Sequence, residues 1–220
     1  MSLPTKQSAY LPLFMLITDR KQTRASLIKT LKLALKGGVT AIQLREKDLS
    51  TKDLYSLACE LRTLTLDFKA SLIINDRVDI ALAVNADGVH LGWQSMPVAI
   101  VRNLVGFKKI IGISTHNLQE ALHAQDCNAD YITYGPIFKT PSKEGILEPT
   151  GTEVLQELKK KVKIPVIALG GIQKENAESI MASGADGIAV VSGILKADNP
   201  EKTAQTLHKI LHNYIKTPFI

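Results

Sequence analysis

Three side chains with the chemistry to bind phosphate lie within one short stretch of the sequence, Gln43 to Lys47. The stretch ends an apolar run, Thr40–Leu44, that has the composition of a buried strand. Alternate side chains of a strand point to the same side, so Gln43 and Arg45 project together, with Lys47 just beyond them. An arginine offers a planar fork of donors and a lysine a point charge, and both suit phosphate oxygens. The competing interpretation is a solvated surface turn.

A second polar pair, Asn75 and Asp76, follows the apolar run Ser71–Ile74. Mg²⁺ is usually held by one or two carboxylates together with substrate phosphates, so a single aspartate can suffice. We therefore expect Asp76 to bind Mg²⁺ and Asn75 to donate a hydrogen bond to a phosphate. The alternative is purely local, with one of the two side chains capping the helix that follows.

Two further regions offer donors to an oxyanion. The long segment from residue 135 to residue 151 is typical of a lid, and it carries three donor side chains, Thr140, Ser142 and Lys143. Two later apolar runs end in small residues, one in the pair Gly170-Gly171 and the other in the pair Ser192-Gly193. Backbone amides at such ends favour phosphate, and a helix opening at Gln173 would add its dipole.

Histidine is sparse where a reacting group could lie. His116 follows the run Ile110–Ser114, and His90 lies within Asp87–Leu91. An imidazole titrates near neutrality, which suits proton transfer, although an isolated histidine is more often a capping or structural residue. Neither histidine has the paired spacing of a zinc site.

The elements that position these side chains form a repeat of roughly two dozen residues, in which an apolar run ends in a polar or glycine-rich tip. The eight runs are Phe14–Thr18, Thr40–Leu44, Ser71–Ile74, Asp87–Leu91, Ile110–Ser114, Asp130–Gly135, Pro165–Gly171 and Gly187–Ser192. Segments with helical spacing separate them. Eight strand–helix units predict a single (β/α)8 (TIM) barrel, an α/β fold that builds its active site at the carboxyl ends of the strands.

The length of 220 residues suits one barrel and no second domain. We expect a loose arm over residues 1–12 and the barrel over residues 13–216. Hydrophobic residues make up 45% of the chain and aromatic residues only 5%, which predicts a core of aliphatic side chains. The cysteines, Cys59 and Cys127, lack metal-ligand spacing and are expected to be reduced and partly buried.

The formal net charge of +6 is carried by scattered lysines. No basic stretch is interleaved with aromatic residues, so we expect phosphorylated small molecules as partners and no nucleic acid. The sequence has no apolar run of membrane-spanning length and no signal peptide, so we expect no membrane contact and a cytoplasmic location. A homo-oligomer is left open.

Together, the strand tips resemble the thiamine phosphate synthase family, with its thiazole tautomerase relatives. Seven segments carry the resemblance in order, Gln43–Asp48, Ile74–Arg77, Asp87–Gly92, Gly112–His116, Gly135–Phe138 with Thr140–Lys143, Ala168–Ile172 and Val191-Ser192. The resemblance implies that a pyrimidine methyl diphosphate and a thiazole phosphate are joined. Diphosphate departs first, and the thiazole nitrogen captures the pyrimidine methyl cation that remains.

The resemblance also implies roles for individual residues. Diphosphate would be bound by Arg45, Lys47, Asn75 and Lys143. Asp76 would bind Mg²⁺, and Gln43 would face the pyrimidine. The thiazole phosphate side would be held by Ser114, Thr140, Ser142, Gly171 and Ser192.

One position departs from the synthase pattern. Ser95 stands where a second Mg²⁺-binding carboxylate is expected, and a hydroxyl is a poorer ligand for a hard cation. The departure raises an alternative, a metal-independent thiazole tautomerase with His116 as the acid/base. Arg45, Lys47 and Asp76 favour the synthase, because a tautomerase has little use for them. A non-catalytic regulator that binds thiazole phosphate is the third hypothesis.

Overall fold

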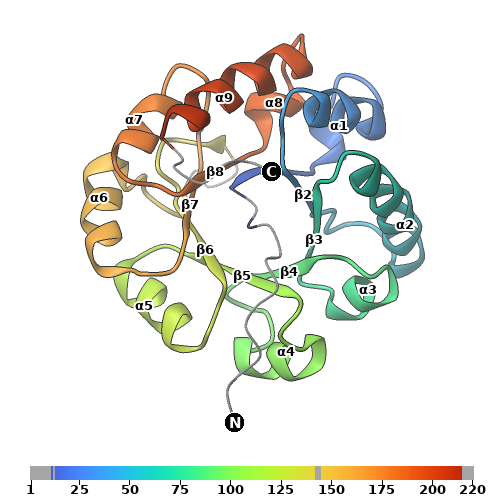
Figure 1. Cartoon of the computed structure of the whole chain (residues 1–220), viewed down its shortest axis with the longest axis horizontal. Coiled ribbons are helices and arrows are strands. Elements are labelled where there is room, and N and C mark those ends of the chain that lie inside the picture. The colour runs from blue at the N-terminus through green and yellow to red at the C-terminus, as the bar shows by residue number, and fades with distance from the viewer. Residues whose placement is uncertain (1–10, 12, 142–144, 215–220) are drawn as a thin grey trace.

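The computed structural model describes residues 11, 13–141 and 145–214. Its eight parallel strands close into a barrel inside a ring of helices, as Figure 1 shows. The strands are β1 (Phe14–Ile17), β2 (Ala41–Leu44), β3 (Ser71–Asn75), β4 (Gly88–Leu91), β5 (Ile110–Thr115), β6 (Tyr131–Tyr134), β7 (Val166–Leu169) and β8 (Gly187–Val190). Each strand pairs with the next, and β8 pairs with β1. The predicted TIM barrel is confirmed.

The helices follow the strands in alternation, and the eighth unit ends in two of them. Their bounds are α1 (Leu27–Lys36), α2 (Thr51–Asp67), α3 (Val78–Ala83), α4 (Val98–Val105), α5 (Leu118–Asp126), α6 (Gly151–Lys161), α7 (Ala177–Ala182), α8 (Ser192–Leu195) and α9 (Pro200–Tyr214), with a 3-10 turn η1 (Arg20–Gln22) after β1. The helix expected to open at Gln173 begins at Ala177, because a turn follows the glycine pair. Of the predicted arm, residues 1–10 and 12 lie outside the described residues.

The core has two layers that follow the alternation of each strand. Outward side chains such as Phe14 and Leu16 pack under the helices, whereas Met15 and Ile17 point into the barrel. Aliphatic side chains fill part of the interior, as predicted, but polar and aromatic side chains also point into it, among them the fully buried Tyr131. Gly112 makes room for that ring, since a Cβ atom there would lie 2.0 Å from Tyr131 Cζ. Of the cysteines, Cys127 is half-buried and Cys59 is exposed on α2, so the expectation of partial burial was wrong for Cys59.

The amino-terminal end of the barrel carries a repeated structural turn. In one example, the Asp130 carboxylate accepts from Arg102 Nη2 at 2.6 Å and from the Ile111 amide at 2.8 Å. Asp87 and Asp186 make the same pair of contacts, with Arg62 and the Leu72 amide and with Lys159 and the Val166 amide. These acids therefore tie a helix to the strand edge, and they lie at the end of the barrel away from the strand tips.

Candidate active site at the strand tips

At the tip of β2, the acidic side chains are bound by one arginine from the preceding tip. Arg20 Nη1 lies 3.0 Å from Glu46 Oε2, and the Arg20 amide donates to Glu46 Oε1 at 3.0 Å. The same guanidinium donates to both carboxylate oxygens of Asp48, at 2.6 and 2.9 Å. Its hydrogen bonds hold the pKa of Asp48 well below the ordinary range. Lys21 Nζ lies 2.7 Å from Asp48 Oδ2, so Arg20 and Lys21 together neutralise the charges of Glu46 and Asp48.

Arg45 and Lys47 alternate with these acids and are exposed. Within the described part of the chain, neither side chain has an ion pair or a hydrogen bond. The Arg45 backbone is fixed, because its amide donates to the buried Thr18 hydroxyl at 2.9 Å. The tip of β2 therefore presents two cations with no acid of their own, which is the arrangement that an anionic ligand requires.

Asn75 and Asp76 end β3 beside this tip. The parallel register pairs Leu44 with Ile74, which brings Asn75 level with Arg45. Asp76 has a φ of 66°, a left-handed conformation that is strained for a residue with a side chain. Neither residue caps α3, whose cap position is Arg77 with no side-chain cap, so the local interpretation was wrong. Strain retained at a strand tip is typical of functional sites.

The Arg77 side chain makes its hydrogen bonds outside this cluster. Its guanidinium donates to both carboxylate oxygens of Asp79, at 2.9 and 2.5 Å, and to Thr51 Oγ1 at 3.1 Å. Arg77 is therefore paired locally, in contrast to Arg45, which has no ion-pair partner among the described residues. The two arginines differ in partners although both follow strand tips.

Below the tips, a buried polar network joins β4, β5 and β6. His90 Nδ1 lies 3.0 Å from the Tyr131 hydroxyl, and His90 Nε2 lies 2.9 Å from Ser114 Oγ. Burial lowers the pKa of His90 to about 3, and the positive charge of Arg45 adds to the effect. His90 is therefore neutral. Ser114 lies at the end of the network that is nearest the strand tips. Thr133 Oγ1 lies 3.4 Å from Ser114 Oγ.

The network of His90, Tyr131 and Thr133 was not predicted from the sequence. A signal was present, since each is a polar residue at an inward position of its strand. Gln43 has the same placement and is only 1% exposed, and its Nε2 has no hydrogen-bond partner among the residues that the structure describes. An unpaired buried amide is uncommon, because leaving such a group unsatisfied costs about 1–3 kcal/mol.

His116 lies at the start of the α5 unit and is held by a carboxylate. Glu120 Oε2 accepts from the His116 amide at 2.8 Å and lies 3.0 Å from His116 Nδ1. Asn117 caps α5, as the sequence predicts, through the Glu120 amide. The carboxylate holds the imidazole through Nδ1, so the other ring nitrogen, Nε2, is not engaged by this contact.

Ser95 lies in the turn between β4 and α4. Its hydroxyl oxygen accepts from the Gly92 amide at 2.7 Å, which closes the turn. Among the described residues no group of three or more His, Cys, Asp or Glu side chains could hold a metal. The exposed Asp76 carboxylate follows β3 and the half-buried Ser95 hydroxyl follows β4. Each is a hard oxygen donor of the kind that Mg²⁺ takes together with phosphates.

The segment after β6 is fastened to the tip of β7. The Ile137 amide donates to Leu169 O at 2.9 Å, and the Phe138 amide donates to Gly170 O at 3.1 Å. Gly171 has a φ of 64°, and a Cβ atom there would lie 2.6 Å from Lys139 O. This close packing brings the segment that carries Thr140 to the β7 tip. Ser142 and Lys143 lie outside the described residues.

The β8 tip completes this side of the barrel. Ser192 opens α8, and a Cβ atom on Gly193 would lie 2.6 Å from Ile172 O, so the β7 and β8 tips are in contact. Asn176 Nδ2 donates to Gly171 O at 2.9 Å and orients that peptide. A groove of about 480 Å³ opens beside Ser192 and Gly193, and its lining carries both bases and acids, Lys174, Lys196, Lys202, Glu175 and Asp198.

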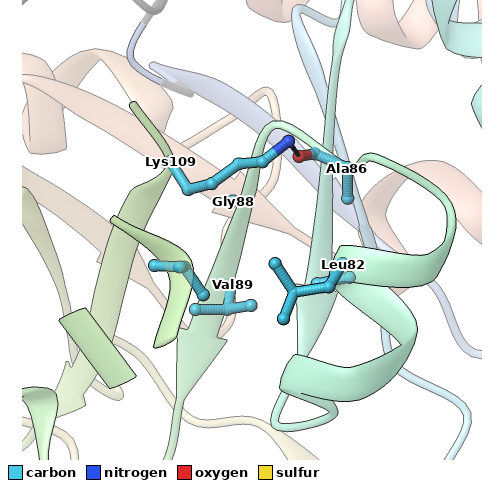
Figure 2. Close-up of a pocket in the computed structure, with 7 residues that line it drawn as sticks. Leu82, Ala86, Gly88, Val89 and Lys109 are labelled. Carbon is cyan, nitrogen blue, oxygen red and sulfur yellow. Dashed lines mark hydrogen bonds between the residues drawn. The ribbon is translucent and has the colours of Figure 1, made fainter. Parts of the chain in front are cut away.

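Another hollow lies away from this chemistry. Figure 2 shows it between α3 and the start of β4, with Leu82, Ala86, Gly88, Val89 and Lys109 around it. Its wall is apolar, and it is too tight to admit water. Lys109 Nζ donates to Ala86 O at 2.6 Å, so the one charged group there serves to close the barrel base.

Comparisons with known proteins agree on one relationship. A family profile described as thiamine monophosphate synthase matches residues 14–194. A thiamine-phosphate synthase of Clostridium novyi (strain NT) is 47% identical over 196 residues, 89% of this chain and 96% of the relative. One from Clostridium acetobutylicum is 47% identical over 197 residues, 89% of this chain and 93% of the relative.

A solved structure gives the same result. The thiamine phosphate pyrophosphorylase from Pyrococcus furiosus superposes with a TM-score of 0.84 at 40% identity, covering 91% of this chain and 95% of the other.

Proposed function

This chain belongs to the thiamine monophosphate synthase family, and from that membership we propose that it acts as a thiamine-phosphate synthase, a transferase of thiamine biosynthesis. The observation that carries the proposal to the strand tips is the pairing at β2. Arg20 binds Glu46 and Asp48, and the intervening Arg45 and Lys47 keep their charges for a ligand.

The proposed reaction joins a pyrimidine methyl diphosphate to a thiazole phosphate. The C–O bond to diphosphate breaks first, and diphosphate leaves with the electron pair. The lone pair of the thiazole nitrogen then forms the C–N bond to the methyl cation, which gives thiamine phosphate and diphosphate. The protein must stabilise negative charge on the leaving group and keep water from the cation.

Diphosphate is bound in this proposal by Arg45, Lys47, Asn75 and Lys143. Support comes from the position of Asn75 beside Arg45 at adjacent strand tips. Preorganised cations stabilise the transition state more than the bound ground state, because the negative charge on the departing oxygen grows in the transition state.

We propose Asp76 as the metal ligand. The Ser95 hydroxyl, which follows the next strand tip, is proposed as a weaker oxygen donor. Support comes from the exposed carboxylate and from the strained backbone that presents it. When bound, Mg²⁺ supplies positive charge to the leaving diphosphate. The Asp76 carboxylate does not cap α3, so no capping hydrogen bond takes it from a metal.

The two rings would lie over the barrel interior. We assign the pyrimidine to Gln43, whose unused Nε2 donor is support for a ligand partner. The thiazole phosphate side is assigned to Ser114, Thr140, Ser142, Gly171 and Ser192. The contact between the β7 and β8 tips supports a phosphate seat there, since barrels commonly bind phosphate at these two loops.

A thiazole tautomerase is the second candidate, and one observation favours it. The pair of Glu120 and His116 Nδ1 at 3.0 Å is suited to proton transfer by Nε2. That activity would need neither Mg²⁺ nor the cations of the β2 tip. The synthase remains the better fit, because it uses both.

The deciding experiment supplies both phosphorylated rings and measures diphosphate release with and without Mg²⁺. We expect Mg²⁺-dependent release, and we expect Arg45→Ala to lower it on the order of 10²- to 10³-fold. Arg77→Ala is the matched control, since Arg77 is paired with Asp79. Isomerisation of a thiazole carboxylate phosphate without metal, lost in His116→Ala, would establish the tautomerase instead. Thiazole phosphate binding without turnover would establish the regulator.

We also propose that the protein works in the cytoplasm, which suits its two free cysteines. No helix in the described ranges has the length and apolar character to cross a bilayer.

A further inference from the structure

The buried polar network depends on a gap in the barrel wall, where β4, β5 and β6 lie side by side (Figure 1). The parallel register places His90 level with Gly112, and Gly112 level with Tyr131. Because Gly112 has no side chain, the Tyr131 ring lies over β5, and its hydroxyl reaches His90 Nδ1 at 3.0 Å. A Cβ atom at Gly112 would lie only 2.5 Å from the Tyr131 hydroxyl oxygen. The glycine therefore allows a residue of β6 to contact a residue of β4.

The hydrogen bond between Tyr131 and His90 has a fixed direction. Tyr131 is fully buried, and His90 Nδ1 is the one acceptor that its hydroxyl meets within the described part of the chain. If Nδ1 carried the imidazole proton, the Tyr131 proton would have no acceptor, which is costly at a buried site. Nδ1 therefore accepts. A neutral imidazole that accepts at Nδ1 carries its proton on Nε2.

Ser114 receives the next hydrogen bonds of the network. His90 Nε2 lies 2.9 Å from Ser114 Oγ, and Thr133, which is level with Ser114 on β6, donates to the same oxygen at 3.4 Å. Both lone pairs of the Ser114 hydroxyl are then occupied, so its proton is free to be donated elsewhere. Ser114 is half-buried, whereas His90, Tyr131 and Thr133 are at most 3% exposed. A ligand can therefore reach the network at Ser114, where it meets a donor.

A donor of fixed direction suits an anionic ligand. The oxygens of a phosphate dianion accept hydrogen bonds and offer no proton, so a serine that donated to His90 would face them with its lone pairs. A series of hydrogen bonds also polarises its last member, which makes the Ser114 hydroxyl a better donor. The alternative is that these polar groups only satisfy one another. Apolar side chains of similar shape would fill the same space at little or no cost in stability, so that alternative gives no reason for a polar network.

We propose that Tyr131 is a positioning residue, which acts through His90 to hold the Ser114 hydroxyl as a donor to the phosphate of the thiazole substrate. This role rests on the proposed function, in which Ser114 belongs to the thiazole phosphate side. Tyr131 is fully buried, so it influences the ligand only through His90 and Ser114. The role also accounts for Gly112, because a larger residue on β5 would separate Tyr131 from His90.

Nitrogen-15 NMR of the full chain, labelled at its histidines, tests the direction of the network without turnover. In the wild type we expect the Nε2–H tautomer of His90, whose signals are identified by their loss in His90→Gln. Tyr131→Phe keeps the ring over Gly112 and removes the donor to Nδ1, so the Nδ1–H tautomer should appear. Tyr134→Phe is the matched control, because Tyr134 lies on the outward face of the same strand and should leave the His90 signals unchanged. A wild type with the proton on Nδ1 overturns the proposal, and so does a Tyr131→Phe chain that keeps the Nε2–H tautomer.

A double-mutant cycle tests whether Tyr131 acts through Ser114. Titration calorimetry measures the Kd of hydroxyethylthiazole phosphate for the wild type, Tyr131→Phe, Ser114→Ala and the double variant. We expect each single change to weaken binding roughly tenfold, and Tyr131→Phe to have less than about a twofold effect in the Ser114→Ala background. An equally large effect of Tyr131→Phe in both backgrounds overturns the proposal, because a loss of packing alone would behave in this way.

Separate measurements decide the synthase activity and the role of Tyr131. Diphosphate release by the wild type tests the synthase, whereas the His90 tautomer and the cycle in Kd require no turnover. Coupling between Tyr131 and Ser114 in a wild type that releases no diphosphate would contradict the synthase and support the positioning role. Diphosphate release without that coupling would contradict the positioning role alone. A wild type that does not bind hydroxyethylthiazole phosphate would overturn both.

Discussion

His90 Nε2 lies 2.9 Å from Ser114 Oγ, and this contact sets which way the serine hydroxyl can donate. Tyr131 has no acceptor other than His90 among the described residues, so its hydroxyl donates to Nδ1. A neutral imidazole with Nδ1 as acceptor carries its proton on Nε2. His90 then donates to Ser114, and the Ser114 proton is left for a ligand at the barrel mouth.

The same burial makes the stability of the fold depend on pH. Burial lowers the pKa of His90 to about 3, below the ordinary value near 6.5, so the unfolded chain binds this proton first. The contribution of neutral His90 is complete above pH 6.5 and is lost as pH falls toward 3. The free energy of unfolding should therefore drop by up to about 1.4 kcal/mol per pH unit in this window.

The measurement is urea denaturation of the wild type and His90→Gln from pH 7 to pH 4.5. The pH slope of the variant should be flatter, because a glutamine cannot be protonated. Exposed His123 gives the control, since His123→Gln should keep the wild-type slope. Equal slopes for wild type and His90→Gln would contradict a buried neutral imidazole.

The sequence predicts the barrel and the tips well for a physical reason. Strand period and strand–helix alternation place Arg45, Asn75 and Ser114 at one end without knowledge of any contact. Contacts between distant strands are different. The bond from His90 to Tyr131 spans 41 residues and depends on how the strands are staggered in the closed barrel. Nothing in the local sequence specifies that stagger.

Partner choice on the surface also escaped prediction. Arg45, Glu46 and Lys47 look like one charged triplet, and only the structure reveals that Arg20 removes Glu46 from it. The expected partial burial of Cys59 was wrong for a similar reason. The rotation of a helix about its axis decides which of its residues face solvent.

A second prediction concerns the strained backbone at Asp76. Its φ of 66° favours glycine, so Asp76→Gly should raise the free energy of unfolding by up to about 1 kcal/mol. The same change should abolish Mg²⁺-dependent diphosphate release if the carboxylate is the metal ligand. Asn128→Gly, at a φ of 63° in the turn before β6, should also stabilise the fold and should leave activity unchanged. Asp76→Gly with full activity would rule out Asp76 as the ligand.

A third prediction follows from the role of Arg20. In Arg20→Ala, Glu46 loses its partner and competes for Arg45 and Lys47, whereas Asp48 keeps Lys21 Nζ at 2.7 Å. The KM for the diphosphate substrate should rise roughly fivefold to tenfold, because the positive potential at the tip falls. Steady-state kinetics measure the effect. Adding Glu46→Gln to Arg20→Ala removes the unpaired charge and should recover part of the loss, whereas a loss of packing alone would not be recovered.

The last prediction returns a carboxylate to the turn after β4. An aspartate oxygen can accept the Gly92 amide as the Ser95 hydroxyl does, so Ser95→Asp should keep the turn. If Ser95 faces the metal held by Asp76, the second carboxylate should lower the Mg²⁺ concentration needed for half-maximal diphosphate release about tenfold. Ser56→Asp, on an exposed position of α2, adds the same charge elsewhere and should leave the requirement unchanged. An unaltered Mg²⁺ titration in Ser95→Asp, with the melting temperature preserved, would mean that this side chain does not reach the ion.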